Sequence, residues 1–250
     1  LGATAEVFNL EMKINRHALQ RGMGSATVAV AGDKSLVQLV DLRSGSLAHV
    51  LRGHTGGGVT SLAWGQGSLL ASGGDSDRRV VIWDVRMAKS YLRYLDSNCV
   101  SSRSSRQHKH AGWSHKGPVQ GLAWTQDGRQ LVSLGQDRRL RRWDVGRGLN
   151  MKTRFPEIDS SDKLTTVDLE ISSGRDGGLV FVPEETGVAM LDLTTGKRVK
   201  ILSGHFSKIY CLKYNPQQLE LYTSGRDRYV HVWSPVESGN DNSESKHLTC

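Results

Sequence analysis

Three segments of this chain repeat the same polar residues at the same spacing, which restricts its possible folds more than any other feature. Each segment begins with Gly-His or Ser-His and reaches a Trp 28 or 29 residues after the His. An Asp precedes each Trp by six residues, and a Ser or Thr lies four or five residues before that Asp. Repeats of this length are single supersecondary units, which bury their apolar faces only by stacking on their neighbours. The recurring residues are His54, Ser72, Asp77 and Trp83, then His115, Ser133, Asp137 and Trp143, then His205, Thr223, Asp227 and Trp233.

Each copy also contains a short apolar strand pattern after its His. Val59–Trp64, Val119–Trp124 and Ile209–Tyr214 all place a β-branched residue first, a Leu fourth and an aromatic residue sixth. Two further units, Val37–Asp41 and Val188–Asp192, keep a strand pattern but lack the Trp. Short β-rich runs between turns predict antiparallel meanders. We therefore expect an all-β fold, a WD-repeat β-propeller with about five four-stranded blades, since the Gly-His to Trp-Asp pattern is typical of that repeat.

The recurring hydroxyl, His and Asp residues allow two interpretations. They could form the triad of a hydrolase, but a triad occurs once in an enzyme, and no G-x-S-x-G elbow accompanies them. A repeated set suits a buried network instead, in which Asp accepts from backbone amides and from His, His donates to the hydroxyl, and the Trp indole meets the same hydroxyl. We expect structural tetrads and no enzymatic activity.

Other motifs give no indication of a cofactor or a metal. No nucleotide-binding P-loop is present, and His108 and His110 lack Cys or acidic partners at ligand spacing. The three cysteines, Cys99, Cys211 and Cys250, are widely spaced, which argues against a disulfide framework and favours a reducing, intracellular compartment. No apolar run reaches the roughly 18–20 residues that span a bilayer, so no membrane association is expected.

The propeller is expected to occupy residues 1–236, followed by a polar, disordered tail at residues 237–250. Ala3–Leu10 is predicted to be the outer strand of a further blade, so that about two of an expected seven blades lie outside this sequence. A basic, Ser-rich insertion at about residues 96–114 separates the first two copies. It is either a solvated loop or a contact for nucleic acid or an acidic partner, through Arg103, Arg106 and Lys109.

Charge is also concentrated beside one strand of the second copy. The chain has a formal net charge of +8, which is compatible with a nucleic-acid or acidic partner. Four arginines flank the strand that ends at Trp143, and we expect it to be exposed and to carry salt bridges. These residues are Arg138, Arg139, Arg141 and Arg142.

From Val7 to about Trp233 the chain resembles the C-terminal two-thirds of the Cockayne syndrome group A family. The matching residues are Ala5–Asn9, Val37–Leu42 with Ser44-Gly45, Ile82–Arg86 and Leu179–Pro183, in the family's order of intact and degenerate blades. The resemblance implies a nuclear, non-catalytic substrate receptor of a cullin-RING E3 ubiquitin ligase in transcription-coupled nucleotide excision repair of DNA damage. It also implies three partners: the ligase adaptor (the large subunit of the damaged-DNA-binding complex), the Cockayne syndrome B translocase and RNA polymerase II.

One tetrapeptide bears on the adaptor. Trp83-Asp84-Val85-Arg86 fits the W-D-x-R pattern shared by receptors of this ligase, so the resemblance implies that Trp83, Asp84 and Arg86 bind the adaptor. An arginine there can offer a bidentate fork to carboxylate or carbonyl groups. The simpler interpretation is an exposed turn arginine. A different class of function also stays open, a general WD-repeat scaffold in RNA processing or chromatin whose basic loop contacts nucleic acid.

Overall fold

The computed structural model describes residues 7–20, 26–87, 91–99, 112–159, 166–172 and 178–235. The strands of these residues form five antiparallel sheets, which we call blades 1 to 5 in chain order. No helix in these ranges has the length and apolar character needed to cross a bilayer.

The first four blades each contain four strands, paired in the order in which they follow one another along the chain. Blade 1 contains β1 (Ile14–Leu19), β2 (Thr27–Gly32), β3 (Leu36–Asp41) and β4 (Ser46–Arg52). Blade 2 contains β5 (Val59–Trp64), β6 (Leu69–Gly74), β7 (Val80–Asp84) and β8 (Arg93–Leu95), with the 3₁₀ turn η1 (Val85–Met87) after β7. Blade 3 contains β9 (Val119–Trp124), β10 (Gln130–Gly135), β11 (Leu140–Asp144) and β12 (Leu149–Asn150).

Blade 4 contains β13 (Glu170–Ile171), β14 (Leu179–Glu184), β15 (Gly187–Asp192) and β16 (Arg198–Ser203). Blade 5 has three strands in the described part of the chain, β17 (Ile209–Asn215), β18 (Glu220–Gly225) and β19 (Val230–Trp233). The expected all-β propeller with about five antiparallel blades is confirmed, and three of the four strands expected in blade 5 lie within the described residues. The described part of the predicted outer strand, Val7–Leu10, is not in a strand, and the predicted tail lies outside the described residues.

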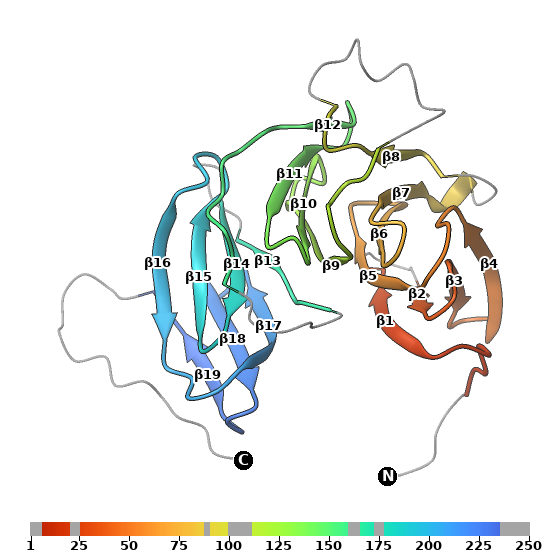
Figure 1. The fold of residues 1–250 in the computed structure, drawn as a ribbon. Helices are drawn as coiled ribbons and strands as arrows, with labels where there is room; N and C mark the ends of the chain where they lie inside the picture. The colour runs from red at the N-terminus through yellow and green to blue at the C-terminus, as the bar shows by residue number, and fades with distance from the viewer. Residues whose placement is uncertain are drawn as a thin grey trace.

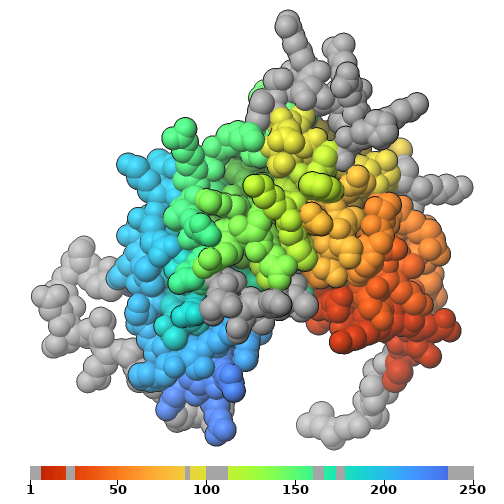
Figure 2. Space-filling view, viewed as in Figure 1, coloured from red at the N-terminus to blue at the C-terminus, as the bar shows by residue number. Residues whose placement is uncertain are grey.

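The blades stand side by side in an arc, with their first strands innermost and their fourth strands at the outer rim (Figure 1). In the space-filling view each blade fills its own sector, and the first and last blades remain apart (Figure 2). The innermost strands line an open cavity of about 520 Å³. Two ion pairs join different blades near this cavity. Arg16 of β1 pairs with Asp168, which lies just before β13, and Lys213 of β17 pairs with Glu170 of β13.

The core lies between the blades. Ala71, Val80 and Ile82 of blade 2 are fully buried against blade 3, where Val119 and Leu131 belong to the same cluster. A blade in the middle of the arc has a neighbouring blade on each face of its sheet, so its strands are apolar on both sides. Full burial of one such aliphatic side chain contributes about 1.5–3 kcal/mol, which makes each blade's stability depend on its neighbours.

The aromatic residue at the sixth position of β5, β9 and β17 joins its blade to the preceding one. The Trp64 indole N–H donates to the carbonyl of Ala18 in blade 1 at 2.8 Å, and Trp124 donates to Ala63 in blade 2 at 2.9 Å. Tyr214 of blade 5 packs its ring 5.4 Å from that of Phe181 in blade 4. The sequence pattern identified the position but did not predict this inter-blade contact.

Candidate functional site

All three predicted sets of polar residues come together, within blades 2, 3 and 5. In blade 3 His115 Nδ1 lies 2.9 Å from Asp137 Oδ1, and His115 Nε2 lies 2.7 Å from Ser133 Oγ. The Trp143 indole N–H donates to the same hydroxyl oxygen at 2.8 Å. The same contacts measure 2.8, 2.7 and 2.8 Å in blade 2 (His54, Ser72, Asp77, Trp83) and 2.6, 2.8 and 2.9 Å in blade 5 (His205, Thr223, Asp227, Trp233).

The tetrads are sealed inside their sheets. Ser72 and Ser133 are 0% exposed, and Thr223 and His115 are each 1% exposed. A neutral imidazole that donates from Nδ1 to the carboxylate accepts at Nε2, so the hydroxyl donates to the ring and accepts from the indole. This bond runs in the opposite direction to the one expected from the sequence. A hydroxyl enclosed in this way is held by two partners and suits packing, not attack on a substrate.

Each tetrad Asp also fixes the segment that leads into its blade. Its second contact is the backbone amide of the residue after the His. Asp77 accepts from Thr55 at 3.1 Å and Asp137 accepts from Lys116 at 2.9 Å. One carboxylate therefore joins the lead-in segment to the turn between the second and third strands.

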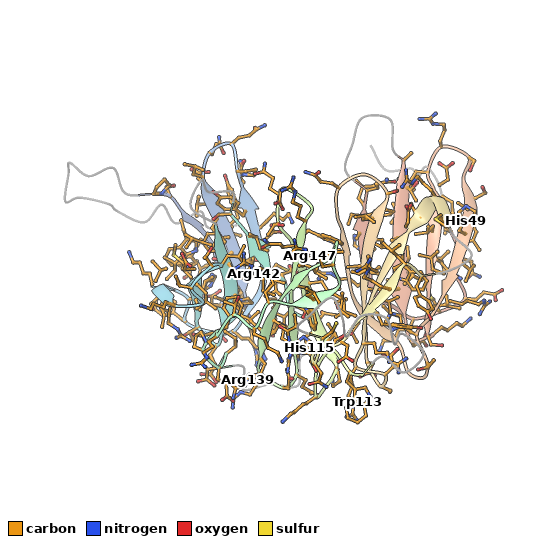
Figure 3. All side chains as sticks on the ribbon, turned by 90° about the horizontal axis from the view of Figure 1, so that it is seen from above. His49, Trp113, His115, Arg139, Arg142 and Arg147 are labelled. Carbon is orange, nitrogen blue, oxygen red and sulfur yellow. The ribbon has the colours of Figure 1, made fainter. Side chains whose placement is uncertain are left out.

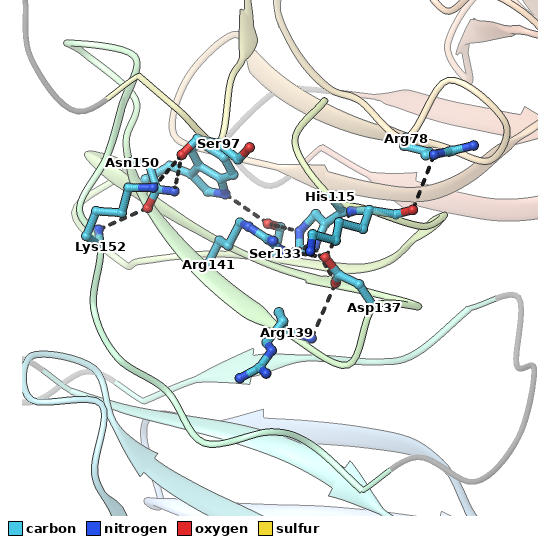
Figure 4. A network of polar contacts seen from close by, with 11 residues as sticks. Arg78, Ser97, His115, Ser133, Asp137, Arg139, Arg141, Asn150 and Lys152 are labelled. Atoms are coloured by element: carbon cyan, nitrogen blue, oxygen red, sulfur yellow. Dashed lines mark hydrogen bonds and ion pairs between the residues drawn. The ribbon is translucent and has the colours of Figure 1, made fainter. Parts of the chain in front are cut away.

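The tetrad of blade 3 has an additional member, visible in Figure 4. Arg141 Nη1 donates to Asp137 Oδ2 at 2.9 Å and lies against His115 Nδ1. The equivalent position, two residues before the Trp, is Val81 in blade 2 and His231 in blade 5. The same tetrad thus lies beside an apolar, a permanently charged or a titratable side chain, depending on the blade.

Three of the four arginines form the expected salt bridges, and Arg138 and Arg139 are exposed as expected. The expected exposure is wrong for Arg141 and Arg142. The Arg141 side chain is only 17% exposed. Arg142 donates to the Leu193 carbonyl of blade 4 at 3.0 Å and to Gln130 Oε1 at 2.8 Å. Arginine buries its aliphatic stem while its guanidinium finds acceptors. These two residues therefore act within and between blades.

Protonation of this site is expected to oppose folding. Burial lowers the pKa of His115, and the charge of Arg141 lowers it further, against the opposing effect of Asp137. Burial alone would raise the pKa of Asp137, but its hydrogen bond with His115 and the Lys116 amide hold it well below its usual range. Both folded-state pKa values therefore lie below the unfolded-state ones.

We predict that the free energy of unfolding falls as the pH drops below about 6.5. In this range His115 binds a proton in the unfolded chain but stays neutral in the folded protein. A second loss follows below about pH 3.9, where the unfolded Asp137 becomes protonated. Urea unfolding from about pH 8 to about pH 4.5 measures the first loss. Arg141→Val introduces the residue found at this position in blade 2. This variant should lose less stability over that range, because the charge that lowers the pKa of His115 is removed. A stability that stays constant over that range would contradict the argument.

Blades 1 and 4 lack both members of the hydroxyl–indole pair. Val30 and Val40 occupy these positions in blade 1, and Val182 and Leu191 occupy them in blade 4. All four side chains are at most 6% exposed. Replacing both hydrogen-bonding partners with apolar groups leaves no buried donor or acceptor unpaired. The degenerate blades therefore keep their packing without a tetrad.

Among the described residues, one group of side chains has potential metal-ligand atoms close together. These atoms belong to His205, Asp227 and His231 and lie within 4.8 Å of one another. Both ring nitrogens of His205 already bond to Asp227 and Thr223, so a metal would have to break the tetrad. The expectation of no metal site stays a prediction.

The W-D-x-R segment separates into a buried and an exposed part. Trp83 is 1% exposed, because its indole belongs to the tetrad. The binding of an adaptor by Trp83, Asp84 and Arg86 stays a prediction. Arg86 lies in η1 with its side chain 77% exposed. Its Nε donates to Asp84 Oδ1 at 3.0 Å and its Nη2 to Oδ2 at 2.7 Å, and these bonds hold the pKa of Asp84 well below its usual range. The result is an exposed guanidinium fixed by a carboxylate, with N–H groups left for a partner.

The basic insertion begins and ends in a stem built from two hydrogen bonds. The Gly112 amide donates to Asp96 Oδ2 at 2.9 Å, and the Ser97 amide donates to the Trp113 carbonyl at 3.2 Å. Trp113 is 57% exposed and lies toward the same face as Arg139 (Figure 3). The residues predicted to contact nucleic acid or an acidic partner, Arg103, Arg106 and Lys109, lie outside the described residues.

The start of this insertion is part of the fold. The Asn150 amide donates to the Cys99 carbonyl at 2.8 Å, and the Asn150 side chain donates to the Ser97 carbonyl at 2.9 Å (Figure 4). Lys152 Nζ donates to the same Ser97 carbonyl at 2.8 Å. Residues 97–99 of the expected loop therefore lie against the outer strand of blade 3, and Cys99 is buried.

The repeats match a known family. The profile of the WD domain, G-beta repeat matches residues 45–84, 107–144 and 196–234. These segments include the three tetrads that the structure assembles. The fold is a WD-repeat β-propeller. Each matched segment ends at the residue after the tetrad Trp, and the first and third contain the outer strand of the preceding blade, β4 or β16.

Several known proteins are similar to parts of this chain. WD repeat-containing protein ATCSA-1 of Arabidopsis thaliana is 29% identical, covering 91% of this chain and 64% of its own length. The uncharacterized WD repeat-containing protein C126.01c of Schizosaccharomyces pombe is 23% identical, covering 83% of this chain and 62% of its own length. THO complex subunit 6 homolog of Danio rerio is 25% identical over 48% of this chain and 38% of its own length. The chain thus spans less than two-thirds of each of these relatives.

Proposed function

We propose that this WD-repeat protein is a non-catalytic substrate receptor of a cullin-RING E3 ubiquitin ligase in transcription-coupled nucleotide excision repair. The observation that carries the proposal is the similarity to ATCSA-1 over 91% of the chain. The order of intact and degenerate blades supports it as well. In this role the propeller works in the nucleus and recruits the Cockayne syndrome B translocase and RNA polymerase II through its surfaces.

The proposed contact for the adaptor, the large subunit of the damaged-DNA-binding complex, is the turn at Asp84 and Arg86. A guanidinium held by two hydrogen bonds loses little side-chain freedom when it binds, so its remaining N–H groups can engage a carbonyl or carboxylate at low entropic cost. Blade 3 has Gly146 where blade 2 has Arg86. Blade 1 has Arg43 there but lacks the Trp, so among the three blades with a tetrad the arginine is found in blade 2 and not in blade 3.

Arg86→Ala is predicted to raise the Kd for the purified adaptor by about tenfold or more, the loss expected for a charge-assisted hydrogen bond. Biolayer interferometry on the intact chain measures it. Arg147→Ala is the matched control, because Arg147 is 75% exposed and follows Asp144 in the equivalent turn of blade 3. Equal Kd values for Arg86→Ala and the unmodified chain would remove Arg86 from the contact. Absence of binding by the unmodified chain would argue against the receptor role.

A general WD-repeat scaffold in RNA processing or chromatin is the second candidate. The relative named as a THO complex subunit and the net charge of +8 favour it. It predicts RNA binding that weakens steeply with salt and is lost when Arg103, Arg106 and Lys109 are replaced by Gln, because phosphate contacts release counterions. Binding insensitive to salt, or absent, would dismiss this candidate.

A further inference from the structure

An arginine at the seam between blades 2 and 3 differs from the other half-buried arginines in the described part of the chain. Six arginines there are half-buried, and five of them have a carboxylate, a carbonyl or an aromatic ring as a partner on the chain. These five are Arg16, Arg78, Arg79, Arg141 and Arg142. The sixth is Arg93. Burying part of a charge without an acceptor is costly, which makes an arginine an unusual residue at this position.

Arg93 points from the outer strand of blade 2 into this seam. Its neighbour Tyr94 faces blade 1, where the tyrosine hydroxyl donates to the Gly53 carbonyl at 2.7 Å. Side chains alternate along a strand, so Arg93 faces blade 3 together with the buried Leu95. There its guanidinium packs on Gly148, where a Cβ would lie 2.7 Å from Arg93 Nη1. Gly148 also has a φ of 70°, so both its backbone and the space beside it leave room for the arginine.

No counter-ion for Arg93 is found among the described residues. Its Nε is buried there without a hydrogen-bond acceptor, and no ion pair of these residues includes it. The carboxylate of the adjoining turn, Asp144, accepts from the Arg147 amide at 2.9 Å and lies 3.8 Å from the Arg147 Nε. The segments 88–90 and 100–111, which flank the outer strand of blade 2 in the sequence, contain no Asp or Glu. Because arginine is always charged in proteins, these observations indicate a second molecule as the source of the neutralising anion.

Arg93 lies at the same edge of the propeller as Arg86. Arg86 belongs to the turn that follows β7, and Gly148, on which Arg93 packs, belongs to the turn that follows β11, the equivalent strand of blade 3. Arg147 of the blade 3 turn lies on the opposite face from Trp113 (Figure 3). Blade 2 therefore presents two positioned guanidinium groups at one edge, Arg86 held by Asp84 and Arg93 held against Gly148.

We propose that Arg93 binds a carboxylate side chain of the partner protein that contacts Arg86, so that this partner carries an Asp or Glu facing the seam between blades 2 and 3. The inference rests on the proposed function, since it adds a second contact to the same docking surface. Gly148 already positions the guanidinium, so pairing with a carboxylate costs little side-chain entropy. A nucleic acid is disfavoured, because its backbone would also bring phosphates against the carboxylates of Asp84 and Asp144 in the two turns.

Biolayer interferometry of the intact chain with the purified adaptor tests this contact. Arg93→Met keeps an aliphatic stem on Gly148 and removes the charge, and it should raise the Kd by about tenfold or more, the loss expected for a charge-assisted hydrogen bond. Arg147→Met is the matched control and should leave the Kd unchanged, because Arg147 stands in the adjoining turn but has Asp144 as its own carboxylate. Arg93→Glu should raise the Kd further than Arg93→Met, since it sets a like charge against the partner's carboxylate.

Thermal unfolding separates binding from folding. A cation without an acceptor adds little to the stability of the free chain, so the Tm of Arg93→Met should lie within about 2 °C of that of the unmodified chain, or above it. A much lower Tm would show that the guanidinium stabilises the free chain and would overturn the inference. An unchanged Kd in Arg93→Met, with the Kd of Arg86→Ala raised, would overturn the inference and leave the proposed function standing. Absence of adaptor binding by the unmodified chain would overturn both.

Discussion

Replacing Asp137 with alanine is expected to lower the free energy of unfolding by about 3 kcal/mol. The carboxylate bonds to four groups at once: the His115 ring, the Arg141 guanidinium and the backbone amides of Lys116 and Arg139. The His115 and Arg141 side chains are largely buried, so removing their acceptor leaves a ring donor and a charge without a partner. Urea unfolding at about pH 7.5 measures the loss. This pH lies above the pKa values of both His115 and Asp137, so neither group titrates during the measurement.

The control for this variant is Asp127→Ala. Asp127 lies in the exposed turn between β9 and β10, where it accepts bonds from Thr125 and from the Arg129 amide. Its loss should cost about 0.5 kcal/mol, as is usual for surface substitutions. Similar free energies of unfolding for the two variants would show that the buried tetrad carboxylate contributes no more to stability than an exposed one. The corresponding blade 5 variant, Asp227→Ala, should lose about 1–3 kcal/mol, because no arginine is stranded there.

Ser133→Ala is expected to cost about 2–3 kcal/mol, although it removes a single oxygen atom. That oxygen connects two buried side chains, since it meets His115 Nε2 and accepts from the Trp143 indole. With no water able to replace it in a fully buried site, both nitrogens lose their partner. Thermal and urea unfolding measure the effect.

A double-mutant cycle distinguishes this network from simple packing. Trp143→Phe removes the indole N–H, so the cost of Ser133→Ala should be smaller in that background than in the unmodified chain. Blades 1 and 4 support this expectation, because they have lost the hydroxyl and the indole together. Fully additive costs in the cycle would contradict a shared hydrogen-bond network.

The fold and the tetrads could be predicted from sequence because both depend on recurrence. Three copies of His, Ser or Thr, Asp and Trp at fixed spacing require one local geometry, and the β-branched, Leu and aromatic pattern places the strand before it. The location of the degenerate blades followed from the same spacing, since Asp41 and Asp192 both lie 13 residues before the next His.

The contacts that the sequence did not reveal are those between different blades. The Trp64 indole bonds to a carbonyl 46 residues earlier, and Arg142 reaches a carbonyl 51 residues later. Neither partner is a side chain, so no residue type marks it in the sequence. Arg141 and Arg142 were expected at the surface because they are charged. They lie between neighbouring blades instead, because hydrogen-bond acceptors for their guanidinium groups are within reach there.

The offset between repeat and blade affects how such a protein can gain or lose blades during evolution. The matched segment 45–84 supplies the outer strand of blade 1 and the three inner strands of blade 2. A duplicated unit of this kind would therefore be anchored on both sides as soon as it is inserted, by strand pairing with the preceding sheet and by stacking against the following one. Duplication of whole repeats would then leave no unpaired sheet edge at the insertion point.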